Sequence, residues 1–532
     1  MVEAAALERQ CERRQAGAFV AGRDKQVKVG CMFLRNGRYG FGLFPRATRS
    51  ASLPRESSIT NIHERARSEG SALVAEPTLL AIDGLRAEAA TLRARGESAP
   101  AARIFGQIAD ALPRDWLAQY NAGAVALEAG DLDGAAKRLE RATQLQASAA
   151  IYRLHAHVLA LRGSIELAAA AYAQAVALAP RDADAHWGLF EVLQLLGDNA
   201  GALRHQRAAL AERSLRSIPA RRAPPRVTIL ELCIAGTFQA NIPLDFILDA
   251  ERTTVYKLYL GEHSIPALPP YDLVFNTIAD APNAGPALAA AQAFIESQSR
   301  PALNAPVAVP LTSRDAVAAR FARSSTVAVA PTVKVDRSSV HAAGQAYPLL
   351  IRPLDSHAGN DLEKIDDDAG LADYLRRTPQ ADEFFMCAFV DYRSADGYYR
   401  KYRIAFVDGI PYPVHLAISP RWMIHYYNAP MADNAWMRDE EHAFMRDMES
   451  VFDGVRATGL REIAQTIPLD YFGIDCSIAP DGRVLLFEAS SAMIVHLRDP
   501  VDLYPYKAQY VPRVVVALER LFAQRLGRSA VA

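Results

Sequence analysis

The sequence predicts a multidomain fold in which an α-solenoid is followed by an α/β domain and an α+β domain. Glycines recur with a period near 34, at positions 96, 130, 163 and 197, and such a period is typical of stacked helix pairs. From residue 227 onward, strand-length apolar runs alternate with helix-like segments, which favours a parallel sheet. Residues 470–496 read as two strands joined by a turn, with one carboxylate on each, Asp475 and Glu488.

Length and composition exclude several classes of protein. The 532 residues predict roughly three or four domains of about 150 residues each. The 59 Lys and Arg residues balance 60 acidic ones, so no electrostatic case exists for nucleic acid or an anionic membrane as partner. Five scattered cysteines without a Cys-x-x-Cys pair argue against a disulfide framework and a zinc knuckle, and they favour a reducing cytoplasm. The chain has no run of eighteen apolar residues and no secretion signal at its start, so we expect a cytoplasmic protein without membrane spans.

Residues 1–72 lack any sustained helical or strand period and mix Gly, Arg, Ser and Pro, which predicts a disordered segment. The alternative is a basic arm for nucleic acid, because arginines and aromatic residues interleave between positions 33 and 49. Disorder is the favoured interpretation, since glutamates dilute the positive charge along the segment.

Residues 78–213 are predicted to form the solenoid. Five positions after each repeat glycine stands an alanine, and a larger residue follows four positions later: Ala101 and Phe105, Ala135 and Leu139, Ala168 and Tyr172, Ala202 and Gln206. Small residues let paired helices approach closely while large ones fill the groove between neighbours. The pattern resembles tetratricopeptide repeats, which implies a concave face that carries a peptide or a protein partner. The alternative is a spacer that docks within the same polypeptide.

Residues 214–226 contain three prolines and several arginines and are predicted to be a surface linker. Within residues 227–300, strands are expected at 227–234, 253–260 and 272–276, with an alanine-rich helix at 285–295. This alternation predicts the separate α/β domain.

Residues 301–526 carry the chemically informative motifs. Two carboxylates buried side by side require a cation between them, and hard oxygen ligands suit Mg²⁺ held together with phosphates. Gly473-Ile474-Asp475 and Glu488-Ala489-Ser490 resemble the last strand pair of ATP-grasp enzymes, in which a Gly-x-Asp is followed by Glu-x-Asn. The resemblance implies that Asp475, Glu488 and Ser490 hold metal, although serine replaces the family's asparagine. It also implies that residues 227–300 match the small domain that precedes the nucleotide-binding part in D-alanine ligases and glutathione synthetases.

The same resemblance assigns phosphate contacts. Arg352 ends an apolar strand where the family has lysine, and its planar fork suits phosphate oxygens. The loop that follows resembles a phosphate lid through Ser356, His357 and Gly359. Lys334 is a further candidate for a nucleotide phosphate.

Two more strands complete the resemblance. The apolar run 383–391 stands where the family lines its adenine pocket, so Phe389 and Val390 are predicted to contact the base. Lys401 and Arg403 stand at the family's Asp-x-Arg positions. Arg403 is predicted to stabilise the reacting phosphoryl group, a task for a fixed cation in a dry site, whereas Lys401 departs from the family and its role stays open.

These parts together predict an ATP- and Mg²⁺-dependent carboxylate–amine ligase that acts through an acyl phosphate on a small carboxylate or peptide. The solenoid would recruit a peptide or protein substrate. A phosphotransferase on the same fold is one alternative, because it would use an identical nucleotide site. The other is a repeat scaffold with a non-catalytic nucleotide fold, in which Ser490 and Arg352 mark lost ligands.

Overall fold

The computed structural model describes residues 76–528 apart from 238–239, 262–263, 280–283, 355, 357–360, 426–427 and 498. The predicted disordered segment, residues 1–72, lies outside this part. The chain divides into two compact units between Arg213 and Ser214. Each unit is described by itself below. None of the described helices is long and apolar enough to cross a membrane.

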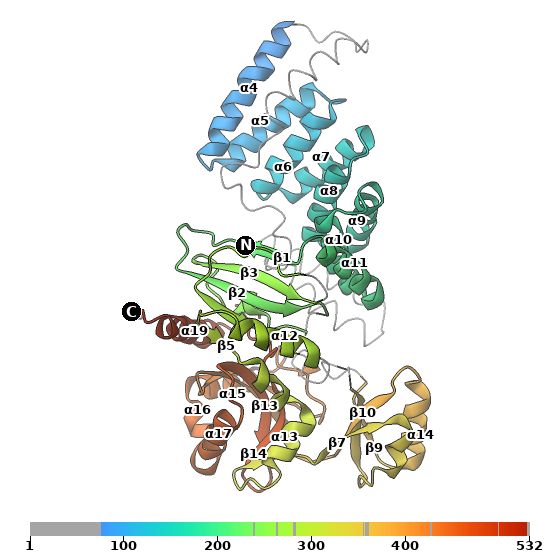
Figure 1. Ribbon diagram of the computed structural model, residues 1–532, viewed down its shortest axis with the longest axis vertical. Helices are drawn as coiled ribbons and strands as arrows, with labels where there is room; N and C mark the ends of the chain where they lie inside the picture. The colour runs from blue at the N-terminus through green and yellow to red at the C-terminus, as the bar shows by residue number, and fades with distance from the viewer. Residues whose placement is uncertain are drawn as a thin grey trace. The chain divides into compact units, whose positions relative to one another are not determined.

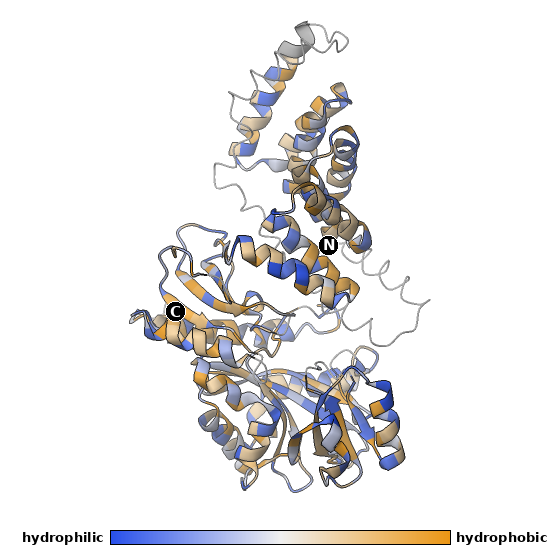
Figure 2. Ribbon diagram, turned by 45° about the vertical axis from the view of Figure 1, so that its right-hand side comes forward, coloured by the Kyte–Doolittle hydropathy of each residue, from blue (hydrophilic) through white to orange (hydrophobic). Residues whose placement is uncertain are grey.

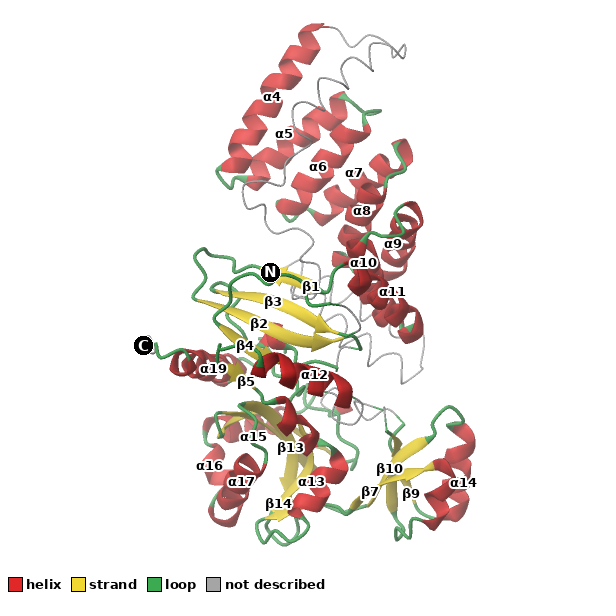
Figure 3. Ribbon diagram, in the orientation of Figure 1, coloured by secondary structure: helices red, strands yellow, loops and turns green. Residues whose placement is uncertain are grey.

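The first unit consists of helix pairs that follow one another along the chain (Figures 1 and 3). The pairs are α4 (Glu76–Ala94) with α5 (Ser98–Ala111), α6 (Trp116–Glu128) with α7 (Leu132–Leu145), α8 (Ala149–Leu161) with α9 (Ile165–Leu178), and α10 (Ala183–Leu196) with α11 (Asn199–Glu212). The ribbons of this unit carry hydrophobic and hydrophilic residues in alternation (Figure 2), as expected for helices with one buried face. The predicted solenoid is therefore confirmed.

The repeat glycines make the turns within these pairs. Each has a left-handed backbone, with φ of 81° at Gly96, 81° at Gly130, 79° at Gly163 and 80° at Gly197. Side chains with a Cβ avoid this conformation, so glycine at each turn keeps the repeat regular. Aspartate side chains accept hydrogen bonds from the first-turn amides of α6, α7, α10 and α11, which fixes where these helices begin.

The small and large repeat residues pack as predicted. The four alanines at positions 101, 135, 168 and 202 are fully buried, and so are Leu139 and Tyr172. A Cβ added to Gly188 of α10 would lie 2.2 Å from Cζ of Tyr172, and one added to Gly123 of α6 would lie 2.6 Å from Cγ of Leu139. The helices thus approach so closely that only glycine fits opposite the large residue.

The second unit begins with a sheet of order β1-β3-β2-β4-β5. Its strands are β1 (Leu215–Ile218), β2 (Val227–Ile234), β3 (Thr253–Leu260), β4 (Leu273–Asn276) and β5 (Ala302–Leu303), with η1 (Leu244–Phe246) and α12 (Gly285–Glu296) between them. β2 to β5 are parallel, as predicted, and β1 is antiparallel to β3. The linker prediction is wrong for residues 215–218, because Leu215 and Ile218 pack against the core and make this segment an edge strand.

A four-stranded antiparallel sheet of order β7-β10-β8-β9 follows. Its strands are β7 (Thr332–Asp336), β8 (Leu349–Pro353), β9 (Glu363–Ile365) and β10 (Glu383–Ala388), and its helices are η3 (Arg337–Ala342) and α14 (Asp368–Arg377). α14 lies beside this sheet (Figure 1), and Leu371 and Tyr374 on it join the apolar cluster under the strands. This sheet has a core of its own.

The third sheet has the order β12-β11-β13-β14-β6. Its strands are β6 (Val327–Ala328), β11 (Tyr399–Val407), β12 (Ile410–Ser419), β13 (Tyr471–Ile478) and β14 (Val484–Ser490); the helices around it are η2 (Pro306–Thr312), α13 (Arg314–Phe321), α15 (Ala435–Arg446), α16 (Met448–Val451), α17 (Gly454–Thr466), α18 (Lys507–Tyr510) and α19 (Pro512–Arg525). The predicted hairpin of residues 470–496 is formed by β13 and β14.

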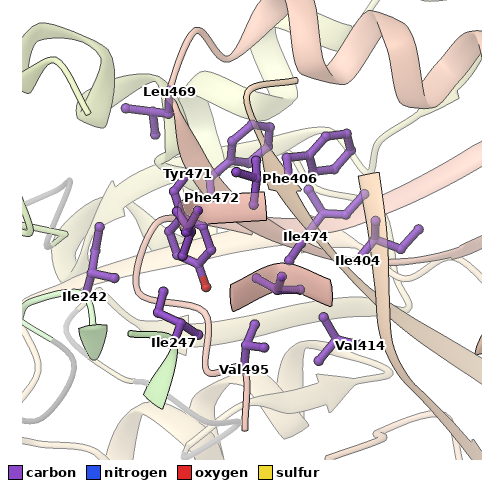
Figure 4. Close-up of a cluster of buried hydrophobic side chains, with 14 of the residues drawn as sticks. Ile242, Ile247, Ile404, Phe406, Val414, Leu469, Tyr471, Phe472, Ile474 and Val495 are labelled. Atoms are coloured by element: carbon purple, nitrogen blue, oxygen red, sulfur yellow. The ribbon is translucent and has the colours of Figure 1, made fainter. Parts of the chain in front are cut away.

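One apolar cluster joins the first and third sheets. Figure 4 shows Ile242 and Ile247, from the first-sheet region, beside Phe472 and Ile474 of β13 and Val495. The cluster thus includes residues from both sides of the boundary predicted at 300 and 301. The parts on the two sides share a core, which holds the end of the third sheet in a fixed position.

Candidate functional site

Three predicted site residues stand next to one another across three strands. Arg403 on β11 pairs with Asp475 on β13, and Asp475 pairs in turn with Glu488 on β14. The ladder between β11 and β12 shifts register between Arg403 and Ile404, and the ladder between β13 and β14 shifts register between Asp475 and Cys476. Bulges of this kind re-aim side chains and are frequent beside active sites. The two irregularities coincide with the site residues.

Asp475 is held by two cations. Arg403 donates from Nε to Oδ1 over 2.8 Å and from Nη2 to Oδ2 over 3.0 Å, and Lys401 Nζ lies 2.9 Å from Oδ2. Lys401 and Arg403 are two positions apart on one strand, so both point to the same face. Burial alone would raise the pKa of the Asp475 carboxyl, but the two cations hold it well below its usual range. Asp475 is therefore an ionised, fully engaged carboxylate.

Glu488 is paired with Arg314, which the sequence interpretation did not single out. Nη2 of Arg314 lies 3.1 Å from Oε2 of Glu488, and its guanidinium stands 5.8 Å from the ring centroid of Phe385 on β10. Desolvation opposes ionisation of Glu488, but Arg314 together with Arg352 and Lys401 outweighs it, so the pKa of the carboxyl is lowered. Its position in the sequence could have indicated that Arg314 has an acidic partner. Arg314 is the first residue of α13, after the N-cap Ser313, and a cation is unfavourable in the first turn of a helix unless a carboxylate pairs with it.

Arg352 lies buried at the end of β8. Its Nε donates to Oγ of Ser356 over 2.9 Å, and its Nη2 contacts the Ser356 carbonyl oxygen, while the Ser356 hydroxyl donates to the Pro353 carbonyl. Burial and the nearby Arg314 lower the pKa of Arg352, but a guanidinium remains charged at neutral pH. The predicted lid residues His357 and Gly359 lie outside the described residues.

Lys334 and Arg352 lie in one row across the four-stranded sheet. Phe385 on β10 pairs with Lys334 on one side and with Arg352 on the other, so all three side chains share a face. Lys334 is half exposed and forms an ion pair with Glu383 over 2.7 Å. This face therefore carries Lys334 and Arg352, and the guanidinium of Arg314 lies over the ring of Phe385 between them.

Phe389 and Val390 follow β10 in a half-buried apolar patch. The Phe389 ring packs edge-on against Trp422, with centroids 5.6 Å apart, and Lys364 Nζ lies 5.1 Å from its centre. Val390, Trp422 and Phe487 pack on a cluster that includes Tyr392. The contact between Phe389 and Trp422 was not predictable from the sequence, because the two residues lie 33 positions apart in the chain.

The metal prediction can be tested against the donor set. Both oxygens of Asp475 accept from cationic donors, Oε2 of Glu488 is paired with Arg314, and Oγ of Ser490 accepts from the Ala492 amide over 3.1 Å. The described residues contain no group of three or more His, Cys, Asp or Glu that could hold a metal ion. A resident divalent ion on Asp475 does not fit this arrangement.

Charge is the common property of the site. Four cations surround the two carboxylates on neighbouring elements: Arg314, Arg352, Lys401 and Arg403. Because these cations outnumber the two carboxylates, positive charge is in excess around Asp475 and Glu488. Phe487, the neighbour of Glu488 on β14, packs on the same apolar cluster as Val390 and Trp422. Chemically, such an arrangement can hold a polyanion that carries a flat apolar group.

Comparisons with known proteins found no matching family model and no matching curated protein. Among solved structures, the chain is similar to MamA, with 21% identity over 24% of this chain and 74% of that chain at a TM-score of 0.23. It is also similar to the VanG D-Ala:D-Ser ligase from Enterococcus faecalis, with 11% identity over 56% of this chain and 99% of that chain, at a TM-score of 0.37. A third similar structure is a D-alanine–D-alanine ligase from Bacillus anthracis complexed with ATP. It shares 10% identity over 57% of this chain and 99% of that chain, at a TM-score of 0.35.

The fold itself is assigned from the repeats and the sheets. Left-handed glycine turns recur every 33 or 34 residues between the paired helices of the first unit. In the second unit a largely parallel sheet precedes an antiparallel sheet and a third sheet that ends in the carboxylate hairpin. The chain thus combines a helical region of tetratricopeptide-like repeats with an α/β region of three sheets.

Proposed function

We propose that the second unit binds ATP and uses it to activate a substrate carboxylate as an acyl phosphate, which an amine or related nucleophile then attacks. The observation that carries this proposal is the group of four cations around Asp475 and Glu488, beside the apolar patch of Phe389 and Trp422. A triphosphate needs the first feature, and an adenine ring fits the second.

Each residue has a role in this proposal. Arg352, steadied by Ser356, binds phosphate oxygens through its fork. Arg403 and Lys401 stabilise the charge that develops on the transferred phosphoryl group. Arg403 is fixed from both sides, because its Nη1 also donates to the Ile494 carbonyl over 3.3 Å. A cation fixed before the reaction loses little energy to reorganisation when the charge develops.

Mg²⁺, the predicted cofactor, has a limited place in this proposal. As a resident ion it does not fit Asp475, so no step is assigned to it. It would enter with the phosphates of ATP, as part of the substrate.

The helical unit is proposed to recruit a peptide or protein substrate. Its support is the regular repeat arrangement, since such solenoids present extended binding surfaces. Deleting residues 78–213 is expected to spare nucleotide binding and abolish turnover of the recruited substrate. Unchanged turnover after the deletion would instead indicate a spacer.

Nucleotide binding is tested by thermal unfolding of the intact chain with a non-hydrolysable ATP analogue. A ligand that binds only the native state raises the unfolding temperature. The wild type is expected to shift upward and Arg352→Met to lose the shift. Arg377→Met is the matched control. Arg377 is an exposed residue of α14, the helix beside the four-stranded sheet that carries Arg352, and it pairs with Glu363 and Asp373. No shift in the wild type would favour the scaffold alternative.

A further inference from the structure

The carboxylate at which a metal ligand was expected is already neutralised by the chain itself. Three donor nitrogens from Lys401 and Arg403 reach the two oxygens of Asp475 at 2.8 to 3.0 Å. These lengths are those of charge-assisted hydrogen bonds. A divalent ion at Asp475 would have to stand beside an ammonium and a guanidinium, which repel it.

We propose that Lys401 and Arg403, held on Asp475, replace a protein-bound divalent ion, so that the site binds the polyphosphate of a nucleotide without a resident metal. This inference rests on the proposed nucleotide function. Under it, Asp475 is a positioning residue that holds two phosphate-binding cations, and Lys401 acquires the role that the sequence left open.

A buried ion pair elsewhere in the second unit has the opposite ratio of charges. In the first sheet, Lys257 lies between Glu231 and Asp245 at 3.4 Å and 3.0 Å, so one cation serves two buried carboxylates. At the candidate site the ratio is reversed, because Asp475 alone receives two cations. Cations that outnumber the carboxylates around them attract an anion from outside the chain.

Glu488, the second carboxylate of the site, is also surrounded by more than one cation. Glu488 receives Arg314 from α13, and Arg352 contributes further positive charge at the same carboxylate. The cations come from three elements: α13, β8 and β11. No single local motif accounts for the charge, so it is a property of the assembled site.

The test is calorimetric titration of the intact wild-type chain with a non-hydrolysable ATP analogue, once with excess EDTA and once with Mg²⁺. We expect dissociation constants that agree within about threefold, because the chain's own cations supply the charge. Binding that is lost in EDTA and restored by Mg²⁺ would overturn the inference and leave the proposed function standing. Absence of binding in both conditions would overturn both.

Two variants of one residue sharpen the test. Lys401→Asp places a second carboxylate beside Asp475, so binding in EDTA is expected to fall about tenfold or more and to recover with Mg²⁺. Lys401→Met removes the charge but keeps an unbranched side chain one atom shorter, and it is expected to weaken binding by a similar factor in both conditions. Equal metal dependence in both variants would contradict the inference.

A direct metal readout is independent of the nucleotide. Mn²⁺ binding, followed by electron paramagnetic resonance without nucleotide, is expected to be absent at this site in the wild type and present in Lys401→Asp. Stoichiometric Mn²⁺ binding by the wild type that Asp475→Asn removes would overturn the inference. Circular dichroism of each variant shows whether it is folded.

Discussion

The two units differ in how far apart in the sequence their contacting residues lie. The helical unit repeats one local contact, in which a small residue meets a large one within about a single repeat, as Gly188 meets Tyr172. The α/β unit assembles its site from residues far apart in sequence, such as Arg352, Arg403 and Glu488. Local contacts follow from a sequence period, whereas the site depends on how three sheets are joined.

Two buried groups, one in each unit, illustrate the difference between desolvation and ion pairing. The helical unit buries a histidine, His157, whose pKa is lowered to about 4 because burial disfavours the charged ring. The α/β unit buries Asp475, whose pKa is lowered by the cations that hold it. The first group costs stability when it is protonated in acid, and the second contributes stability while it is ionised. His157 and Asp475 should therefore lose their contributions to stability over different ranges of pH. Burial also lowers the pKa of His415 in the α/β unit, so a buried histidine of this kind occurs in both units.

The largest expected effect is on the α/β unit. Asp475→Ala leaves Lys401 and Arg403 without their carboxylate, and losing one partner of a buried pair costs about 3–5 kcal/mol. Urea unfolding of the intact chain measures the loss. Asp481→Ala is the control on the turn of the same hairpin, where an exposed pair with Arg483 is worth under about 1 kcal/mol. Equal losses in the two variants would contradict the account of Asp475.

The next effect separates His157 from Asp475 by pH. His157 takes up a proton near pH 6.5 in the unfolded chain and near pH 4 in the folded one, so the helical unit loses stability as pH falls between these values. The full loss is up to about 3 kcal/mol, at about 1.4 kcal/mol per pKa unit. Asp475 stays ionised in both states over this interval, and its contribution is lost only below about pH 4.

Unfolding curves at pH 7 and pH 5 check this contrast. The transition of the helical unit is expected to move to lower urea at pH 5, and His157→Gln is expected to reduce the movement. A pH dependence that His157→Gln leaves unchanged would assign the titration to another group.

A smaller effect tests the close approach of the helices. Gly188→Ala places a Cβ against the fully buried ring of Tyr172, and overpacking costs about 1–3 kcal/mol. Gly106→Ala is the matched control on α5, where a Cβ meets nothing within 4 Å. It should stabilise the helix by up to about 1 kcal/mol, because alanine favours helices. Opposite signs are expected in thermal unfolding, and two losses of equal size would contradict the packing account.

The smallest expected effect on stability concerns Lys334. Its pair with Glu383 is half exposed, so Lys334→Ala should cost under about 1 kcal/mol of unfolding free energy. Weaker binding of the ATP analogue by the same variant, with stability nearly unchanged, would assign Lys334 to the phosphates. Unchanged binding would leave it a surface residue.

The sequence was a good guide wherever a short period or a turn decided the structure. The repeat glycines and the hairpin that joins Asp475 to Glu488 were predictable, because each depends on residues close in the chain. Arg314 was not predictable as a partner of Glu488, since only the packing of α13 near β14 brings them together. Residues 215–218 have the composition of a linker, because an arginine lies among them and prolines follow, although the segment forms an edge strand.

The most direct measurement of the central claim is calorimetric titration of the ATP analogue into the wild type and into Arg314→Met. The claim is that cations from separate elements together form one polyphosphate site, so the variant is expected to bind about tenfold more weakly or worse. Arg320→Met, at the exposed end of the same helix, should bind like the wild type. Equal affinities for all three chains would contradict the claim.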